Sequence, residues 1–276
     1  MSFKKISIYI SVIIVCLLTI FPFLWIISTS FKPANEVYSF PPKLIPNNIT
    51  LEGYKTLLET SSTFHFLKWT WNSFFVSFLT TIFSLFIATL GGYGMSRFRF
   101  KGRLAIGYII LLTQVLPGSL LVVPLYIIMN NLGLLNTHFG LMIAYTTFSV
   151  PFCTWMMKGF FDTIPKSIDQ AALIDGCNKF TSFFYVVLPL AKSGLVATGI
   201  FSFITGWNEY LFASVFLKRY TMWTLPVGIS SFQGQYTTDW NVLMAGSALI
   251  ALPVVVIFWL LQKQLVSGMT AGSVKQ

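Results

Sequence analysis

Long apolar runs, separated by shorter polar stretches, constrain this chain more than any other feature of its sequence. Several exceed the roughly 20 apolar residues that an α-helix needs to cross about 30 Å of hydrocarbon. Only 9% of the 276 residues are charged, whereas an average soluble domain has about 25%. The sequence therefore predicts an all-α integral membrane protein, because a transmembrane barrel would show alternating segments of about ten residues.

The apolar runs predict six transmembrane helices. They cover about Ile6–Phe31, Trp71–Met95, Leu104–Met129, Phe139–Met157, Leu188–Phe216 and Val242–Gln264. The first run is longer than a signal-peptide core of about 7–15 residues and lacks a small-residue cleavage site, so we expect it to be retained. Residues 1–70 then form the first span with an outer loop, and residues 71–276 form a five-helix core.

Prolines and glycines modify two of these spans. Pro117 and Pro124 are expected to break the third span, because each proline removes a helical hydrogen bond. Gly91, Gly92 and Gly94 lie near the end of the second span and permit another helix to approach closely.

The distribution of basic residues predicts the orientation. Six spans place both termini on one side, and that side holds 12 of the 18 lysines and arginines, whereas the other side holds 6. Basic residues accumulate in cytoplasmic loops, so both termini are predicted to be cytoplasmic. The run Arg97–Arg103 contains four of the 12. It is interpreted as an orientation signal in preference to a site for anionic lipid.

A polar stretch between the fourth and fifth predicted spans, Lys158–Lys192, is here called the elbow. It contains three of the eight acidic residues, Asp162, Asp169 and Asp175. A charged segment of this kind indicates either a docking surface for a soluble partner or an amphipathic loop that lies on the membrane.

Local signals within the elbow predict two short helices joined by a turn. Pro165 suits the first turn of a helix, since its missing N–H would be unpaired there. Gly176 follows Asp175 and suits the left-handed position just past a helix end. Asn178 is a candidate N-cap for the second helix.

The spacing within the elbow resembles the E-A-A-x3-G-x9-I-x-L-P signature of permease subunits of bacterial ATP-binding-cassette importers. The matching positions are Gln170, Ala171, Ala172, Gly176, Val186, Leu188 and Pro189. Gln170 replaces the family glutamate and removes a charge, and Val186 replaces isoleucine. Segments 201–216, 225–232 and 271–276 also look like the carbohydrate branch of that family, of the maltose-permease type with a C-terminal tail.

The resemblance implies a function for several groups of residues. The elbow (about 159–187) would be the coupling helix in a cleft of the ATP-hydrolysing subunit, with contacts from Gln170, Ala171, Ala172, Asp175, Gly176, Leu188 and Pro189. The tail (265–276) would reach between two ATPase subunits through Gly268, Ala271, Gly272 and Val274. An outer loop would contact the solute-binding protein through Ser231, Phe232, Gln233, Gly234, Gln235 and Tyr236.

Asn208 and Glu209 are candidates for the translocation path or its gate. Glu209 is the one acidic residue that we place inside a predicted span. A carboxylate within a membrane is costly and usually faces a cavity or a partner. The alternative interpretation is a hydrogen bond between helices near the outer interface.

The resemblance implies an importer of a sugar or oligosaccharide that is bound to the bacterial cytoplasmic membrane. Its partners would be membrane lipid, a second homologous permease, two copies of an ATP-binding subunit and an extracytoplasmic solute-binding protein. A related solute such as glycerol phosphate, or a secondary transporter, is the alternative.

The remaining residues predict no catalysis by this chain. The sequence has no G-x-x-x-x-G-K-[ST] phosphate loop, so ATP hydrolysis is expected in a separate subunit. Cys16, Cys153 and Cys177 are scattered, so no metal site, cofactor or disulfide framework is predicted. The net charge of +10 is assigned to membrane orientation and not to nucleic-acid binding.

Overall fold

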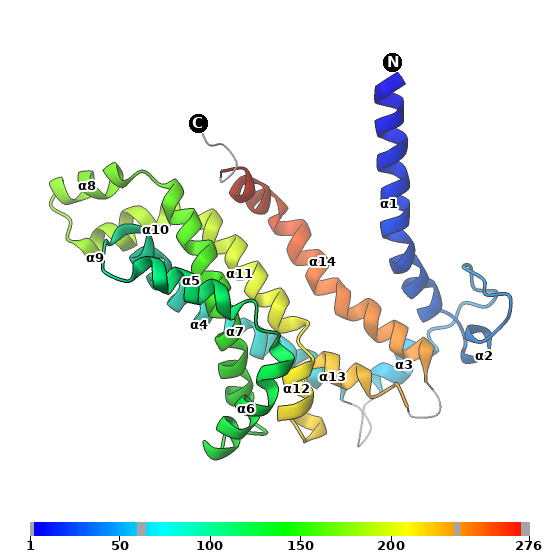
Figure 1. The fold of residues 1–276 in the computed structure, drawn as a ribbon. Helices are drawn as coiled ribbons and strands as arrows, with labels where there is room; N and C mark the ends of the chain where they lie inside the picture. The colour runs from blue at the N-terminus through cyan, green and yellow to red at the C-terminus, as the bar shows by residue number, and fades with distance from the viewer. Residues whose placement is uncertain (1–2, 60–64, 235–237, 272–276) are drawn as a thin grey trace. The chain divides into compact units, whose positions relative to one another are not determined.

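The computed structural model describes residues 3–59, 65–234 and 238–271, and within these ranges it consists of helices and one antiparallel β-bridge, between Gln233 and Thr238 (Figure 1). The chain forms two compact units. The first comprises Met1–Trp69 and Leu225–Val254, and the second comprises Thr70–Thr224 and Val255–Gln276.

Four single helices are long and apolar enough to cross a membrane. They are α1 (Phe3–Ser30), α4 (Phe66–Arg97), α7 (His138–Thr163) and α14 (Trp240–Ala271), the last through its apolar part Trp240–Gln262. Each corresponds to a predicted span, with ends that differ from the predicted ones by a few residues. The side chains of α1 are exposed along the apolar part of the helix, which suits a helix surrounded by hydrocarbon.

Two further candidate spans are bent pairs of helices. The first pair is α5 (Arg103–Thr113) and α6 (Gly118–Asn131), which meet at 98°. Pro117 precedes α6 and accounts for the break, whereas Pro124 lies within α6 and does not interrupt it. The expectation that both prolines break the span is therefore correct only for Pro117. Within the described residues the count is four spans, or up to six if each bent pair is one span.

The predicted span over Leu188–Phe216 is not one continuous helix. The segments α9 (Lys179–Ser182), η1 (Phe183–Val187) and α10 (Leu188–Leu190) form one arm that meets α11 (Lys192–Trp207) at 75°. A second break at 208–210 separates α11 from α12 (Leu211–Phe216). Polar residues stand at both breaks, Lys192 at the first and Asn208 and Glu209 at the second, but the apolar runs on either side are long enough that hydropathy predicts one span.

The first unit contains the end of α1 and three short helices. These are α2 (Ala34–Val37), α3 (Glu52–Leu58) and α13 (Leu225–Ser230). Ser30 and Tyr54 share a hydrogen bond of 2.8 Å. The ring of Trp69, 0% exposed, packs against Gly228, where any side chain would overlap it.

The second unit is built on α7. A hydrogen bond of 2.8 Å joins Ser149 of α7 to Ser202 of α11. Asn72 of α4 donates two hydrogen bonds, to the carbonyls of Thr221 in the 3-10 helix η2 (Tyr220–Met222) and of Trp223. Helices α8 (Lys166–Ile174) to α10 lie at one end of this unit, and α6 and α12 lie at the other (Figure 1).

Candidate functional site: the polar elbow

The backbone of the elbow has the predicted form of two short helices joined by a glycine turn. Gly176 has φ +90°. The N–H of Cys177 donates to the carbonyl of Ala172 (2.9 Å), and the N–H of Gly176 donates to that of Leu173 (3.2 Å). These two bonds are the Schellman pattern that satisfies the end of a helix. The Asn178 side chain caps α9 by accepting from the Thr181 N–H at 2.8 Å, as predicted, whereas Pro165 sits one residue before α8.

A buried ion pair fixes the elbow to the end of α4. The Arg97 Nε lies 2.9 Å from Asp169 Oδ2, and the two side chains are 6% and 16% exposed. Arg97 Nη2 also donates to the Ile164 carbonyl at the α7–α8 corner (3.0 Å). The Tyr93 hydroxyl donates to Asp169 Oδ1 (3.0 Å). One helix of the membrane region therefore holds both the corner and the first helix of the elbow.

A second set of polar contacts supports the end of α7. Ser96 donates to Asp162 Oδ1 (2.6 Å), and the Lys158 ammonium lies 2.6 Å from Asp162 Oδ2. Two of the three elbow carboxylates, Asp162 and Asp169, thus bind the chain's own residues. Asp175 is exposed beside the glycine turn.

Apolar packing completes the attachment. Val187 and Phe161 are 0% exposed, and Phe183 is 4% exposed, in a cluster that also contains residues of α4 and α7. The ring of Tyr93 contacts Phe183, with centroids 4.5 Å apart. Ile168 and Leu188 pack against the same cluster. Packed elements move as bodies, so a force on α8 is transmitted to α4 and α7.

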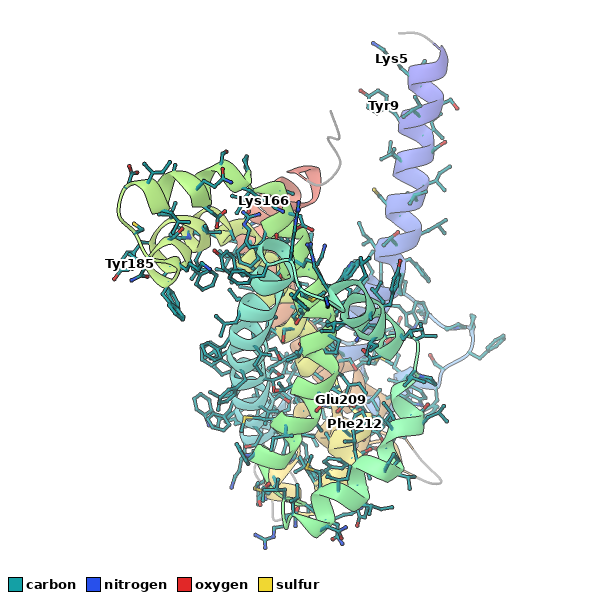
Figure 2. All side chains as sticks on the ribbon, turned by 60° about the vertical axis from the view of Figure 1, so that its left-hand side comes forward. Lys5, Tyr9, Lys166, Tyr185, Glu209 and Phe212 are labelled. Atoms are coloured by element: carbon teal, nitrogen blue, oxygen red, sulfur yellow. The ribbon has the colours of Figure 1, made fainter. Side chains whose placement is uncertain are left out.

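The outer face of the elbow carries small, polar and apolar side chains that the chain does not cover. Gln170, Ala171, Gly176 and Pro189 are exposed. Large apolar side chains are exposed beside them: Ile174 (86%), Phe180 (77%) and Tyr185 (80%). Figure 2 shows Tyr185 at the outer edge of the elbow. Ala172 is only 6% exposed and Leu188 packs in the cluster, so these two positions lie on the inner side.

The residues that anchor the elbow were not singled out by sequence reasoning. Arg97 was counted as one of four basic residues in an orientation signal, and Tyr93 was not considered. Arg97 differs from Arg99 because it is withdrawn from solvent, whereas Arg99 is exposed. Arg97 lies on the last turn of α4, one turn after Tyr93, and this position is the sequence signal for its anchoring role. Its partner, Asp169, lies 72 residues further along the chain.

Glu209 lies in the break between α11 and α12, next to Asn208 at the end of α11. Its carboxylate accepts hydrogen bonds from the backbone N–H groups of Phe212 (2.8 Å) and Ala213 (3.2 Å), and Figure 2 shows Glu209 next to Phe212. A carboxylate at a helix start satisfies unpaired N–H groups. These two hydrogen bonds explain why an acidic residue is half-buried at this position. A role of Glu209 in a gate stays a prediction.

The remaining predicted site residues lie in two places. Ser231, Gln233 and Gly234 are exposed at the described part of the outer loop, whereas Phe232 is buried. Gly268 and Ala271 belong to the end of α14, which continues helical through the start of the predicted tail. Gln235, Tyr236, Gly272 and Val274 lie outside the described residues. No cluster of three or more His, Cys, Asp or Glu side chains that could hold a metal occurs in the described ranges.

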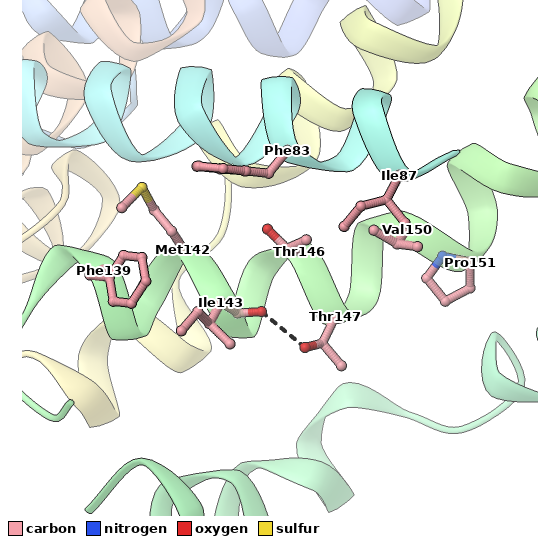
Figure 3. A pocket seen from close by; sticks show the side chains of 9 residues that line it. All are labelled: Phe83, Ile87, Phe139, Met142, Ile143, Thr146, Thr147, Val150 and Pro151. Carbon is pink, nitrogen blue, oxygen red and sulfur yellow. Dashed lines mark hydrogen bonds between the residues drawn. The ribbon is translucent and has the colours of Figure 1, made fainter. Parts of the chain in front are cut away.

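A hollow of about 430 Å³ between α4 and α7 is almost wholly apolar (Figure 3). Phe83 and Ile87 line it from α4, and Met142 and Val150 line it from α7. The Thr147 hydroxyl on its wall donates to the Ile143 carbonyl (2.9 Å). The hollow suits an acyl chain or an apolar helix more than a polar solute.

Apolar helices long enough to cross a membrane, together with a braced polar elbow whose outer face is uncovered, define the class of a transmembrane permease subunit. The family model "Binding-protein-dependent transport system inner membrane component" matches residues 81–271. The chain belongs to this family, and is thus a multi-pass membrane protein and a permease subunit of an ATP-binding-cassette importer.

Curated relatives match almost the whole chain. The inner membrane ABC transporter permease protein YcjP of Escherichia coli is 38% identical over 274 residues, 99% of this chain and 98% of that one. The diacetylchitobiose uptake system permease protein DasC of Streptomyces coelicolor is 37% identical, with 93% and 92% covered. The trehalose/maltose transport system permease protein MalG of Thermococcus litoralis is 34% identical, with 99% and 97% covered.

A solved structure has the same fold. A chain of a bacterial ABC transporter involved in the import of the acidic polysaccharide alginate superposes with a TM-score of 0.76 at 24% identity. The match covers 94% of this chain and 95% of that one.

Proposed function

We propose that this chain forms half of the translocation path of an importer for a sugar or oligosaccharide. The names of three relatives, which concern diacetylchitobiose, trehalose/maltose and galactooligosaccharides, support this substrate class. The partners would be a second related permease, two copies of an ATP-hydrolysing subunit and an extracytoplasmic binding protein. Both termini and the elbow would then be cytoplasmic.

The observation that carries the proposal is the two-sided construction of the elbow. Its inner side is fixed to α4 by Arg97 and Asp169, and its outer side leaves Gln170, Ala171 and Ile174 uncovered. Small and apolar side chains allow a second protein to approach closely and exclude water. Closure of an ATPase dimer would push on this face, and the brace would pass the movement to the membrane helices.

Gln170 would contribute a hydrogen bond to that interface and not an ion pair. Its side chain is exposed on α8, and its amide has both donors and an acceptor. The interface would therefore not depend on a charge at this position, in contrast to the glutamate of the family signature.

The test is the response of the assembled complex to a substitution on the outer face. A Cβ at Gly176 meets no atom within 4 Å, so the side chain of Gly176→Arg would start in open space and could extend to where the ATPase subunit would lie. We expect the complex to lose either its ATPase subunit or the ATPase stimulation by loaded binding protein.

The matched control is Gly133→Arg, at the turn after α6. Gly133 has φ +67°, and a Cβ there also meets nothing within 4 Å. Both substitutions place a residue with a Cβ at positive φ, which costs about 1–2 kcal/mol. Backbone strain is therefore present in both variants. If Gly176→Arg assembles and stimulates like Gly133→Arg, the elbow is not the coupling surface. A chain that transports the sugar without any ATPase subunit is a secondary transporter, and the proposal is wrong.

A further inference from the structure

A small pocket in the first unit has the composition of a ligand site. It has a volume of about 230 Å³ and lies where the end of α1, the segment after it and the start of α14 meet. The residues that matter for its chemistry are three aromatic and three polar side chains: Trp25, Tyr38, Trp240, Thr29, Lys32 and Glu36.

Lys32 is buried without a carboxylate partner. Its side chain is only 4% exposed. The ammonium donates to the Lys43 carbonyl (2.6 Å) and lies 4.9 Å from the centre of the Trp25 ring. The ion pairs of the described residues are Arg97–Asp169 and Lys158–Asp162, so none involves Lys32. An ammonium has three donors, and withdrawal from water is costly unless they find acceptors.

Thr29 presents a second unsatisfied group on the same wall. It is 5% exposed, and its hydroxyl has no hydrogen-bond partner. Buried polar atoms are nearly always paired, so an unpaired one requires an explanation. Trp25 and Thr29 lie four residues apart, on one face of the last turns of α1. Lys32 follows in the turn after the helix, where its backbone N–H donates to the Thr29 carbonyl (3.1 Å). A ligand in the pocket would reach all three.

Aromatic rings supply the apolar part of the wall. Tyr38 and Trp240 remain 65% and 38% exposed, and the Tyr38 hydroxyl is held by the Thr238 carbonyl (2.6 Å). Rings that are fixed at one end and uncovered on a face suit a flat partner with an apolar side and a polar rim. A sugar ring has this form, with C–H groups on its faces and hydroxyls around its edge.

The charge of the wall argues against an anionic ligand. Glu36 lines the pocket together with Lys32, so the formal charges cancel. The Glu36 carboxylate is fixed by the N–H (2.7 Å) and the side-chain amide (3.0 Å) of Asn47. A phosphate headgroup would gain from Lys32 but would be repelled by Glu36. A neutral hydroxyl both accepts from the ammonium and donates to the carboxylate.

We propose that this pocket binds one ring of a neutral sugar, and is a subsite for carbohydrate in the first unit of the chain. Its volume is below the ~300–1,000 Å³ of sites for drug-sized ligands, so a single ring is the appropriate size. The choice of carbohydrate rests on the proposed function, whereas the pocket, the buried ammonium and the unpaired hydroxyl do not.

The test measures saturation transfer from the full chain in phosphatidylcholine nanodiscs to maltose, trehalose and diacetylchitobiose by NMR. Thr29→Val and Lys32→Met keep the side-chain size and remove the polar groups. We expect each to weaken sugar binding roughly tenfold, since each removes a hydrogen bond from a water-poor site. Thr29→Val should leave the thermal stability of the sugar-free protein unchanged or higher, because the hydroxyl has no partner there to lose.

Matched controls are available outside the pocket. Thr19→Val removes an exposed hydroxyl from the same helix, one that donates to the Val15 carbonyl, and Lys55→Met removes an exposed ammonium from α3. Both should bind sugar like the natural chain. Absence of transfer to all three sugars overturns the proposal, as does equal binding by Thr29→Val and Lys32→Met.

Two further outcomes distinguish a sugar site from a lipid site, and the subsite from the proposed function. Nanodiscs with phosphatidylglycerol test a lipid headgroup. If Lys32→Met reduces the retention of that lipid while no sugar binds, the pocket is a lipid site and the proposal is wrong. If the complex shows stimulated ATPase activity but the chain binds no sugar, the subsite is wrong and the proposed function stands. Sugar binding that depends on Thr29 and Lys32 supports the subsite even in a chain that no ATPase subunit joins.

Discussion

Single glycines decide how closely α4 and α7 pack. A Cβ at Gly92 would lie 2.8 Å from the backbone nitrogen of Lys158 and 2.9 Å from the Cβ of Met157. At Gly94, two residues further along α4, a Cβ meets nothing within 4 Å. Packing therefore requires a glycine at position 92 but not at position 94. The sequence alone does not show which of the two glycines is required.

Gly92→Leu should therefore destabilise the protein, and Gly94→Leu should not. Overpacking of a close helix contact costs about 1–3 kcal/mol, whereas Gly94→Leu replaces a poor helix former where there is room. Thermal unfolding of the purified chain in detergent, followed by size-exclusion chromatography after heating, measures both. Equal losses for the two variants would mean that α4 does not approach α7 at Gly92.

At the scale of elements, the elbow is bound at both of its ends, as its proposed role in coupling requires. Arg97 holds α8 through Asp169 and the preceding corner through the Ile164 carbonyl. Val187 and Phe183 fix the second arm in the apolar cluster. Without the polar brace, α8 would be tied to the membrane helices mainly through apolar contacts, which are less directional.

Arg97→Ala and Asp169→Ala should each uncouple the elbow from α4. Each leaves one buried charge unpaired, at a cost of roughly 3 kcal/mol or more, and the double variant should cost less than the sum of the two. The thermal midpoint and the binding-protein-stimulated ATPase of the assembled complex should both fall in the single variants. Arg99→Ala is the control, because Arg99 is exposed. Additive effects in the double variant would show that the two side chains act independently.

At the scale of the whole molecule, the distribution of basic residues predicts the orientation that the proposed function requires. The predicted inner side holds 12 of the 18 basic residues, and it includes the elbow and both termini. An ATPase subunit could reach the elbow only if that side is cytoplasmic. The sugar pocket at the end of α1 would then open on the opposite side, where substrate arrives.

Reporter fusions should confirm this orientation. Green fluorescent protein fused after Gln276, or after Phe100 in the basic loop, should fluoresce, and alkaline phosphatase at the same positions should be inactive. A phosphatase fusion after Leu134, between α6 and α7, should be active because that turn is predicted to be external. An active phosphatase after Gln276 would reverse the orientation and contradict the assignment of the elbow.

Features that depend on near neighbours in the chain could be predicted from the amino-acid sequence alone. Apolar runs identified a membrane protein, and Gly176 and Asn178 predicted the turn and the cap that the structure contains. The spacing around the elbow indicated the family to which the chain belongs. These signals are local, because helix capping, left-handed turns and hydropathy involve residues within a few positions of one another.

Which groups face inward and which remain exposed depends on contacts between distant parts of the chain. Asp169 and Asp175 are equivalent in sequence terms, yet one is paired with an arginine 72 positions earlier and the other is exposed. The pocket at Thr29 and Lys32 needs Trp240, which lies more than 200 residues further along the chain. Such features depend on contacts between distant segments, and a hydropathy pattern holds no information about those contacts.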